Sequence, residues 1–533
     1  MPDNDASPTE KTAPAETGAA FPVVGIGASA GGLEALTLLL KALPCDTGMG
    51  FVIVQHLAPA HASSLSEILA RATKMPVCEV SDEPEVEPNH VYVIPPARDI
   101  IISGGKLLLL PQERNARHRG IDQFFRSLAE DSRHQAIGVV LSGSATDGTL
   151  GLEVIKAEGG VTFAQDESAQ HDSMPKSAVA SGCVDFVLPP DGIAAEIGRI
   201  ARHPYIAAPV APMAVEVGGS ADDGDGSGHS RIAEIVRRAT GVDFTHYKAA
   251  TMQRRIQRRM MVHKIETVAE YEEHLRATPG EIEALYQDVL ISVTSFFRNP
   301  DAFEVLAKKI FPKVLAERTR QEPVRLWTLG CSTGEEAYSL AMLFAECAES
   351  AKSTAQLQVF ASDLNASCIE RARVGRYPRS ISQDVSSERL QKFFVEEDGH
   401  YRVNKSIRER VVFSRHNVLA DPPFSRVDFI SCRNLLIYLE PVLQQQVMPL
   451  LHYALKPGGH LWLGSSESVG TSRALFDVED TRHKIFSRRP GPTPPGTRFR
   501  PSQDSTLFPT SAPELRETPQ TMLHRDAERV LLA

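Results

Sequence analysis

Three segments in the N-terminal half carry a serine, a histidine and an aspartate that together could hydrolyse an ester. Ser29 lies in the motif GASAG after an apolar run, and the flanking glycines permit the sharp turn that exposes a nucleophile. His56 follows the next apolar run, and Asp147 lies in a glycine-flanked loop after a third. Because the carboxyl ends of parallel strands share one edge of a sheet, we expect the three side chains to meet there. The histidine would act as general base, and the aspartate would orient it.

The same segments admit other interpretations. The pattern GIGASA fits a dinucleotide-binding fingerprint, but such a site needs an acidic residue about 20 positions later, and the second run ends without a carboxylate. His61 could replace His56 as the base, and Asp147 could simply cap a helix. The chain order Ser…His…Asp differs from the Ser…Asp…His of α/β-hydrolases, so a different fold is expected.

A second group of candidate residues lies in the C-terminal half. The apolar run VRLWTLG leads into a glycine-rich stretch, Gly330 to Gly334, and a helical pattern follows. Glycines there let a ligand approach the backbone closely. Glu335 and Glu336 would repel a phosphate and no P-loop lysine is present, so a ribose or the cationic methionine end of S-adenosylmethionine is the better match. The next apolar run ends at Asp363, which could accept hydrogen bonds from ribose hydroxyls.

A KPGG turn at residues 456–459 precedes a late strand in the same half. Such a turn is common in class I methyltransferases. A glycine-rich loop, an aspartate that ends the next strand and this turn, in that order, predict a Rossmann-like domain that binds S-adenosylmethionine.

The N-terminal motifs GIGASAGG, QHLAPAH and LSGSATDGTLG resemble those of the CheB methylesterase domain, which hydrolyses glutamate methyl esters on chemotaxis receptors. The resemblance spans about residues 21–203. It implies that Ser29 is the nucleophile, His56 the base and Asp147 the residue that orients the base. Ala30 stands where the family usually has a threonine, and we expect no receiver domain of the kind that normally precedes the esterase. Both the rate and the regulation of the esterase are therefore expected to depart from the family's pattern.

The C-terminal motifs SVTSFFRNP, GCSTGEEAYSLA, ASDLNASCIERARVGRY, RHNVLADPPF and SCRNLLIYL resemble CheR, the methyltransferase that esterifies receptor glutamates, over about residues 231–486. The resemblance implies that Tyr438 lies beside the transferring methyl group. Ser292 replaces an asparagine that is frequent in the first motif. The resemblance also implies these contacts with S-adenosylmethionine: Thr294, Arg298, Glu336, Asp363, Asn417, Val418, Arg433 and Asn434.

Methyl transfer to a glutamate would require little acid–base chemistry. The carboxylate is already ionised at neutral pH, so no general base is needed. Catalysis would come from aligning the carboxylate oxygen, the methyl carbon and the sulfonium sulfur. Arg298 could grip the substrate carboxylate or that of the methyl donor, although an arginine paired with a nearby acid for structural reasons is the alternative.

A chain of 533 residues is too long for one core, so an α/β multidomain fold is expected. The predicted parts are a parallel-sheet methylesterase domain, then a helical subdomain and a class I Rossmann-like methyltransferase domain with a small β-subdomain. Their predicted boundaries are a disordered leader over 1–20, the esterase over 21–203, a flexible linker over 204–229, the helical subdomain over 230–298, the methyltransferase over 299–488 with its β insert at about 393–413, and a Pro-rich tail over 489–533.

Composition excludes several classes of partner. The net charge of −10 argues against wholesale binding of nucleic acid or anionic membranes. The seven cysteines contain no CxxC pair, which indicates reduced thiols and no metal site. No apolar stretch is long enough to cross a bilayer, so we expect a cytoplasmic protein without membrane insertion.

A basic run, YKAATMQRRIQRRMMVHK over residues 247–264, carries six lysines and arginines and no acid. Pairs such as Arg254 and Arg258 are four residues apart and would share a helix face. The run is interpreted as either a solvated face or a dock for an acidic partner.

The leading prediction is a bifunctional enzyme that methylates receptor glutamates and hydrolyses the resulting esters. Its expected partners are the cytosolic domains of chemotaxis-type receptors, with histidine-kinase signalling components as a second class. One alternative is a signalling scaffold with an active methyltransferase and a non-catalytic esterase half. Another is a methyltransferase for small molecules or nucleic acid. Because simultaneous activity of both halves would consume the methyl donor uselessly, reciprocal control is expected.

Overall fold

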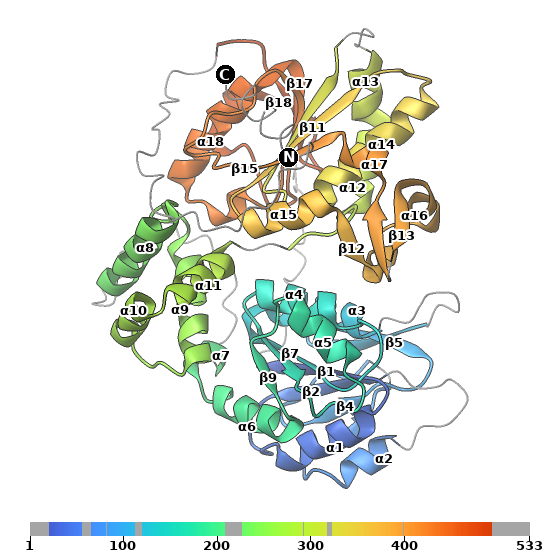
Figure 1. The fold of residues 1–533 in the computed structure, drawn as a ribbon, viewed down its shortest axis with the longest axis vertical. Coiled ribbons are helices and arrows are strands. Elements are labelled where there is room, and N and C mark those ends of the chain that lie inside the picture. The colour runs from blue at the N-terminus through green and yellow to red at the C-terminus, as the bar shows by residue number, and fades with distance from the viewer. Residues whose placement is uncertain are drawn as a thin grey trace, which may run out of the picture. The chain divides into compact units, whose positions relative to one another are not determined.

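The structure is a computed structural model that describes residues 21–55, 65–81, 83–111, 120–207, 226–290, 293–316, 322–397 and 399–492. It divides into two compact units, Met1–Ala221 and Asp222–Ala533, which are described separately below (Figure 1). His56, His61 and Ser292 lie outside the described residues, as do the predicted leader and most of the predicted tail. Across the described ranges, every helix is too short or too polar to cross a membrane.

The first unit is built on a seven-stranded parallel sheet in the order β3-β4-β2-β1-β7-β8-β9. Its central strands are buried on both faces, which explains why they read as continuous apolar runs rather than alternating patterns. The strands are β1 (Val23–Ala28), β2 (Gly50–Gln55), β3 (Val77–Glu79), β4 (Val91–Val93), β7 (Ala136–Val140), β8 (Val161–Gln165) and β9 (Phe186–Leu188).

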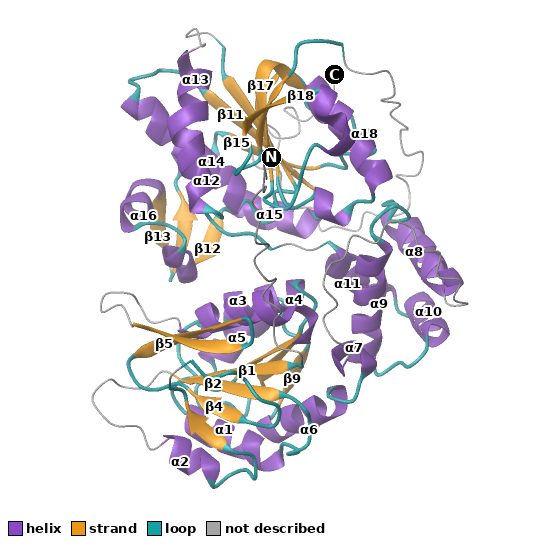
Figure 2. Cartoon of the chain, turned by 180° about the vertical axis from the view of Figure 1, so that it is seen from behind, coloured by secondary structure: helices purple, strands orange, loops and turns teal. Residues whose placement is uncertain are grey.

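Helices cover both faces of this sheet. Figure 2 shows α1 (Gly32–Ala42), α2 (Leu65–Ala70) and α6 (Pro190–Ile200) on one side, and α3 (Gly120–Ser132), α4 (Thr149–Ala157) and α5 (Ser173–Ala180) on the other. A hairpin of β5 (Arg98–Ser103) and β6 (Lys106–Pro111) packs against α3. The predicted α/β domain with a parallel sheet is confirmed. Two ends of the predicted linker are helical, however: α7 (Pro204–Ala207) and the start of α8 (Gly226–Thr240).

The second unit begins with four helices that have a core of their own. They are α8, α9 (Ala249–His263), α10 (Val268–Ala277) and α11 (Pro279–Val289). Fully buried Ile256, Tyr271, Leu275 and Leu285 are part of that core. The predicted helical subdomain is confirmed.

A mixed seven-stranded sheet follows, in the order β15-β11-β10-β16-β17-β19-β18. The first five strands are parallel, and β19 runs antiparallel to both of its neighbours. Strand order reverses at β10, so the carboxyl ends of β10, β11 and β16 form the switch point where ligands bind in such sheets. The strands are β10 (Val324–Leu329), β11 (Leu357–Asp363), β15 (Val411–Arg415), β16 (Val427–Cys432), β17 (Leu455–Leu463), β18 (Phe476–Asp480) and β19 (Ile485–Arg488).

Helices flank this second sheet and a small sheet interrupts it. The flanking helices are α12 (Pro300–Val305), α13 (Phe311–Ala316), α14 (Glu335–Ser350), α15 (Ala366–Val374) and α18 (Pro441–Ala454). The small sheet has the order β12-β14-β13, with β12 (Arg376–Pro378), β13 (Phe394–Glu397) and β14 (His400–Val403), and α16 (Ser387–Phe393) and α17 (Lys405–Arg408) adjoin it in the chain.

The small sheet differs from its predicted extent of 393–413. It starts earlier, because β12 pairs with β14 across a helical connection that a local turn signal does not reveal. Residues 411–413 instead belong to β15 of the main sheet. The Rossmann-like methyltransferase fold with a β-subdomain is nevertheless confirmed.

Candidate active sites

The backbone at Ser29 forms a tight turn between β1 and α1. Gly31 has a φ of 73°, a left-handed conformation that favours glycine. The Ser29 N–H donates to the Ser142 carbonyl at 2.9 Å, and the Gly32 N–H donates to the Ser29 carbonyl at 2.9 Å. These bonds fix the serine at the carboxyl end of β1, in the position expected of a nucleophile elbow.

Ser142, two residues after the end of β7, stabilises this turn through its hydroxyl. Its hydroxyl donates to the Ala30 carbonyl at 2.8 Å and accepts from the His171 N–H at 3.0 Å. Ser142 is buried, with 1% of its surface exposed. The sequence motif LSGSATDG contains Ser142, but its type alone did not distinguish it from other loop serines.

Asp147 lies in the loop between β7 and α4 and is buried. Its carboxylate accepts backbone N–H groups of Ile121 at 3.1 Å, Asp122 at 2.9 Å and Gly148 at 2.9 Å. Asp147 therefore caps α3, since Ile121 and Asp122 lie in the first turn of that helix. A carboxylate offers about four acceptor positions, so capping is compatible with orienting a histidine as well. Because His56 is outside the described residues, the structure brings Ser29 and Asp147 to neighbouring strand ends and leaves the base a prediction.

The dinucleotide interpretation of the first motif is wrong. A side chain added at Gly25 would meet the rings of Phe124 and Phe125 at 2.9 Å, and one at Gly27 would meet Ile121 at 2.4 Å. These glycines therefore allow α3 to pack against β1, and no space for a pyrophosphate remains at those positions.

The glycine-rich loop of the second unit contains two glycines with different surroundings. Gly334 has a φ of 94°, and an added Cβ would lie 2.9 Å from Ala372 Cβ and 3.0 Å from Phe413. Gly330 also has a positive φ, of 63°, but the atoms nearest to an added Cβ belong to Leu435 and lie 3.8 Å or more away, which is ordinary van der Waals contact. Gly334 therefore serves internal packing, whereas Gly330 leaves the backbone open to a ligand.

Asp363, the last residue of β11, joins the loop to the neighbouring strand end. Its Oδ2 accepts the Ser332 N–H at 2.8 Å and its Oδ1 accepts the Asn365 N–H at 2.8 Å. Burial raises the pKa of this carboxyl, and the backbone donors oppose the rise. The His416 N–H donates to the Asp363 carbonyl at 3.0 Å, and Asn417 and Val418 are the next two residues along the chain.

Glu336 and Arg433 form a buried ion pair of 2.7 Å. The other oxygen of Glu336 accepts the Ser431 hydroxyl at 2.6 Å. The second amino group of Arg433 donates to the Arg298 carbonyl at 3.0 Å and to Asn299 Oδ1 at 2.6 Å. The Arg433 guanidinium is therefore bonded to other groups of the protein. It holds Glu336 and the backbone of Arg298 in place.

The backbone around Arg298 is held in an unusual conformation. Phe297 and Asn299 on either side have φ values of 50° and 64°. The Phe297 N–H donates to the Ser339 hydroxyl at 3.0 Å, and the Arg389 guanidinium stacks 4.0 Å from the Phe297 ring centre. Such strained residues persist only where their surroundings determine them. Thr294, four residues earlier, is half-buried.

Tyr438 is attached to the helical subdomain through its backbone. The Lys248 N–H donates to the Tyr438 carbonyl at 3.0 Å, and the Glu440 N–H donates to the His246 carbonyl at 3.0 Å. Tyr247 and Leu439 form an isolated β-bridge between these bonds. Among the predicted methyltransferase residues, Arg433 thus bonds both Glu336 and the backbone of Arg298. Asp363 is linked to His416, the residue before Asn417, and Asn434 and Tyr438 lie in one segment after β16.

Three protein-family models match the chain. A CheB methylesterase model covers residues 24–197, a CheR all-alpha domain covers 229–290, and a CheR SAM-binding domain covers 292–485. A chemotaxis protein methyltransferase from Listeria monocytogenes is 32% identical over 238 residues, which are 45% of this chain and 88% of that protein. The chain belongs to the CheR methyltransferase family. A CheB methylesterase domain precedes its CheR part, which makes it a CheB–CheR fusion.

Two further similarities concern the CheB domain and the whole fusion. An uncharacterized 104.1 kDa protein of Rhodobacter capsulatus is 40% identical over 446 residues, 81% of this chain, and this chain spans 47% of that protein. The crystal structure of the Thermotoga maritima CheB methylesterase catalytic domain matches with 31% identity and a TM-score of 0.32, covering 34% of this chain and all of that one.

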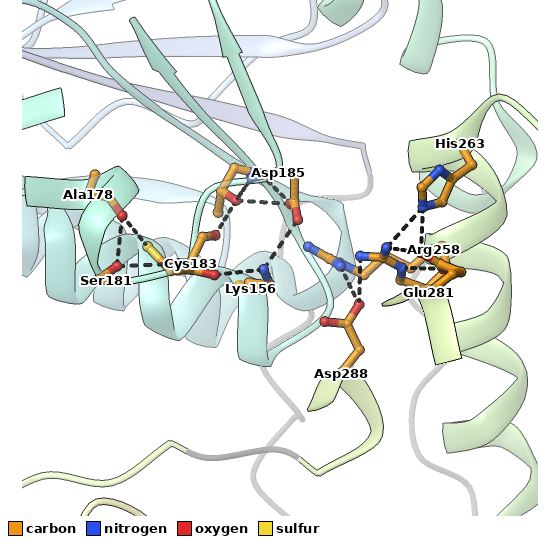
Figure 3. Close-up of polar contacts among 12 residues, drawn as sticks. Lys156, Ala178, Ser181, Cys183, Asp185, Arg258, His263, Glu281 and Asp288 are labelled. Atoms are coloured by element: carbon orange, nitrogen blue, oxygen red, sulfur yellow. Dashed lines mark hydrogen bonds and ion pairs between the residues drawn. The ribbon is translucent and has the colours of Figure 1, made fainter. Parts of the chain in front are cut away.

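The basic run of the CheR all-alpha domain lies on α9. Arg258 pairs with Asp288 at 2.6 Å (Figure 3). The Nε of Arg259 donates to Glu281 at 2.8 Å. Both interpretations of the run, a solvated face and a dock for an acidic partner, are wrong for these two arginines, because acids of α11 already neutralise them. The acids were missed because they are 22 and 30 residues away in sequence.

Glu281 is expected to make the stability of this subdomain pH-dependent. Burial by itself would raise its pKa, but hydrogen bonds from His263, Arg259 and Tyr271 lower the pKa to about 2. A free glutamate has a pKa of about 4.3. The stabilisation is therefore complete above about pH 4.3 and is lost as the pH falls toward about 2, with a total on the order of 3 kcal/mol.

Amide hydrogen exchange in α9 and α11, measured between about pH 5 and pH 2.5 and corrected for intrinsic rates, checks this expectation. As the pH falls, the amides of α9 and α11 should lose protection in the wild type. In Glu281→Gln the loss should be much smaller, although that variant is less stable already at pH 5. Glu283→Gln on the exposed side of α11 is the matched control. If protection fell with pH at the same rate in the wild type and in Glu281→Gln, Glu281 would not be the source of the pH dependence.

His263, His274 and Glu281 are the one group of possible metal ligands found among the described residues, with ligand atoms within 4.8 Å of one another. An amino group of Arg259 hydrogen-bonds Glu281 and lies 2.9 Å from His263 Nε2. A cationic side chain thus lies where a metal ion would have to bind, so this group is accounted for by the ion-pair network. The absence of a metal cofactor stays a prediction.

Proposed function

We propose that this CheB–CheR fusion acts in both directions on one modification. Its CheR part would use S-adenosylmethionine to methylate glutamates on the cytosolic domains of chemotaxis-type receptors. Its CheB domain would hydrolyse the resulting methyl esters to glutamate and methanol. The family matches support both types of enzyme. Ser29 directly follows β1 of the first sheet, and Asp363 ends β11 of the second.

Asp363 is the observation that carries the methyltransferase proposal. It ends β11 next to the switch point, and its carboxylate retains acceptor capacity after receiving two backbone N–H groups. Gly330 leaves the adjoining backbone open. A ribose diol beside Asp363 and a small ligand over Gly330 match these donor and steric requirements, so the residues fit S-adenosylmethionine.

Bound there, S-adenosylmethionine would supply an electrophilic methyl group on its sulfonium sulfur. The chain's residues would supply alignment. Arg298 would hold a carboxylate with two parallel hydrogen bonds. Its backbone is fixed for this role by the bond from Arg433 and by the bond of the neighbouring Phe297 N–H to Ser339. Tyr438 would border the reacting centre. The substrate glutamate is ionised at neutral pH, so no residue has to remove a proton.

In the CheB domain, the Ser29 hydroxyl would attack the ester carbonyl while His56 accepts its proton. Collapse of the tetrahedral intermediate would break the bond to the methoxy group, and His56 would return the proton to form methanol. Water would then hydrolyse the acyl-serine by the same route, releasing glutamate. Asp147 would orient His56 from the loop after β7.

The proposed function is tested by incubating the full chain with methyl-labelled S-adenosylmethionine and receptor cytosolic domains. The expected product is label on receptor protein that mild base releases as volatile methanol, since carboxyl esters are base-labile. Label that stays on protein after base treatment, or that appears on small molecules or nucleic acid, would exclude glutamate O-methylation.

A second candidate function rests on Ala30. It is exposed next to Ser29, where the family usually has a threonine, so one hydroxyl is missing beside the proposed reacting centre. In this case the CheB domain would bind methylated receptor without turnover and serve as a scaffold for an active CheR part. Methanol release from pre-methylated receptor distinguishes the two candidates.

A further inference from the structure

The segment from Arg433 to Tyr438 follows β16, ends in a short 3-10 turn and carries three of the proposed methyltransferase residues, Arg433, Asn434 and Tyr438. Asn434 in this segment has a φ of 56°, a left-handed conformation that costs a non-glycine residue free energy. Its far end is attached through Tyr438 to Lys248, as described above. The near end is held through the backbone N–H groups of Asn434 and Leu436.

Glu467, from the loop after β17, supplies the acceptors for these groups. It is 4% exposed, and both carboxylate oxygens are engaged. Oε2 accepts the N–H groups of Asn434 at 2.9 Å and Gly464 at 2.7 Å. Oε1 accepts those of Leu436 at 2.7 Å and Ile437 at 3.3 Å. One buried side chain therefore orients three backbone amides of the segment and one of its own loop.

Gly464 provides independent evidence that this arrangement is closely fitted. A Cβ at this position would lie 2.6 Å from Glu467 Oε2 and 3.0 Å from the Asn434 nitrogen. Contacts below 3.0 Å require a shift, and here a side chain would displace the carboxylate from the amides it binds. The glycine thus leaves the space that the carboxylate needs.

We propose that Glu467 is a positioning residue for methyl transfer. It sets the backbone of Asn434 to Ile437, and through that backbone the placement of the Asn434 and Tyr438 side chains at the methyl-donor site. This inference rests on the proposed function of the CheR part and extends it to a residue that contacts neither substrate. Burying a carboxylate costs free energy because the charge loses its water. For Glu467, four backbone N–H donors offset this cost in place of a cation.

Glutamine should not substitute for Glu467, although it has the same shape. Each oxygen accepts two N–H groups, so either orientation of the amide would turn its NH₂ toward two backbone donors. Gly464→Ala perturbs the same contacts while keeping the carboxylate. Glu388→Gln is the control. It removes the same charge from an exposed glutamate in the first turn of α16 that makes none of these contacts.

The test uses the full chain with each of these three substitutions. Calorimetric binding of S-adenosylhomocysteine gives affinity and the number of competent sites, and methyl transfer gives kcat per competent site and KM for receptor. We expect about tenfold weaker binding and about tenfold lower kcat in Glu467→Gln and in Gly464→Ala, with KM for receptor unchanged within about twofold. Glu388→Gln should match the wild type.

Wild-type affinity and kcat per competent site in both Glu467→Gln and Gly464→Ala would overturn the proposal. So would a uniform loss of competent sites with unaltered kinetics in the remainder, because a purely structural residue gives that result. If Glu467→Gln does not fold, Gly464→Ala decides. Failure of the proposed function appears differently, as a wild-type chain that binds S-adenosylhomocysteine but makes no base-labile product, and the binding measurement still decides the role of Glu467.

Discussion

Ser29→Ala is expected to abolish methanol release from methylated receptor while leaving methyl transfer intact. The substitution removes the proposed nucleophile and no other group, because the bonds that fix the turn come from the backbone of Ser29. Loss of a nucleophile of this kind lowers kcat by roughly 10³-fold to 10⁶-fold. Release of volatile label from receptor methylated beforehand measures the effect.

Two comparisons make this result specific. Ser103→Ala changes an exposed serine on the β5–β6 hairpin and should release methanol at the wild-type rate. Asp147→Asn should also reduce the rate, and it should lower the stability of α3 because Asp147 accepts N–H groups at the start of that helix. Equal methanol release by the wild type and Ser29→Ala would remove Ser29 as the nucleophile. No release by the wild type would favour the scaffold.

Asp363→Asn is expected to weaken binding of S-adenosylmethionine and its demethylated product by about tenfold to a hundredfold. The carboxylate accepts the Ser332 and Asn365 N–H groups with different oxygens, so an amide would turn its NH₂ against one of them. The glycine-rich loop would lose that connection, and the proposed ribose contact would lose a charged acceptor. A hydrogen bond to a charged group contributes about 1.5–3 kcal/mol.

Equilibrium binding to the full chain, with the thermal unfolding of the methyltransferase unit as a measure of its folding, tests this expectation. Methanol release should be unchanged, because Asp363 belongs to the other compact unit. Asp477→Asn, on β18 and paired with Arg489 at the surface, is the matched control. Unaltered affinity in Asp363→Asn would mean that the methyl donor does not bind at the end of β11.

The sequence by itself predicted the two α/β folds and the family of each part. Buried parallel strands read as short apolar runs, and glycine-rich turns after them mark strand ends, so local patterns were enough to locate Ser29, Asp147 and Asp363. Glu336 and Arg433 were also named from motifs, but their ion pair joins residues 97 apart in the chain, which no local pattern reveals.

Tertiary structure decided which polar side chains support others. The arginines of α9 suggested a charged surface, yet Arg259 lies against Glu281 because α9 and α11 pack together. Glu467 follows a strand in the ordinary loop sequence GSSES, and only the pairing of β16 with β17 brings it to the backbone of Asn434. Burial converts such a glutamate from a solvated loop residue into an acceptor for four amides, because an unpaired carboxylate there would be too costly. The sequence specifies residue types along each strand end, whereas the contacts between strand ends follow from the register and packing of the whole sheet.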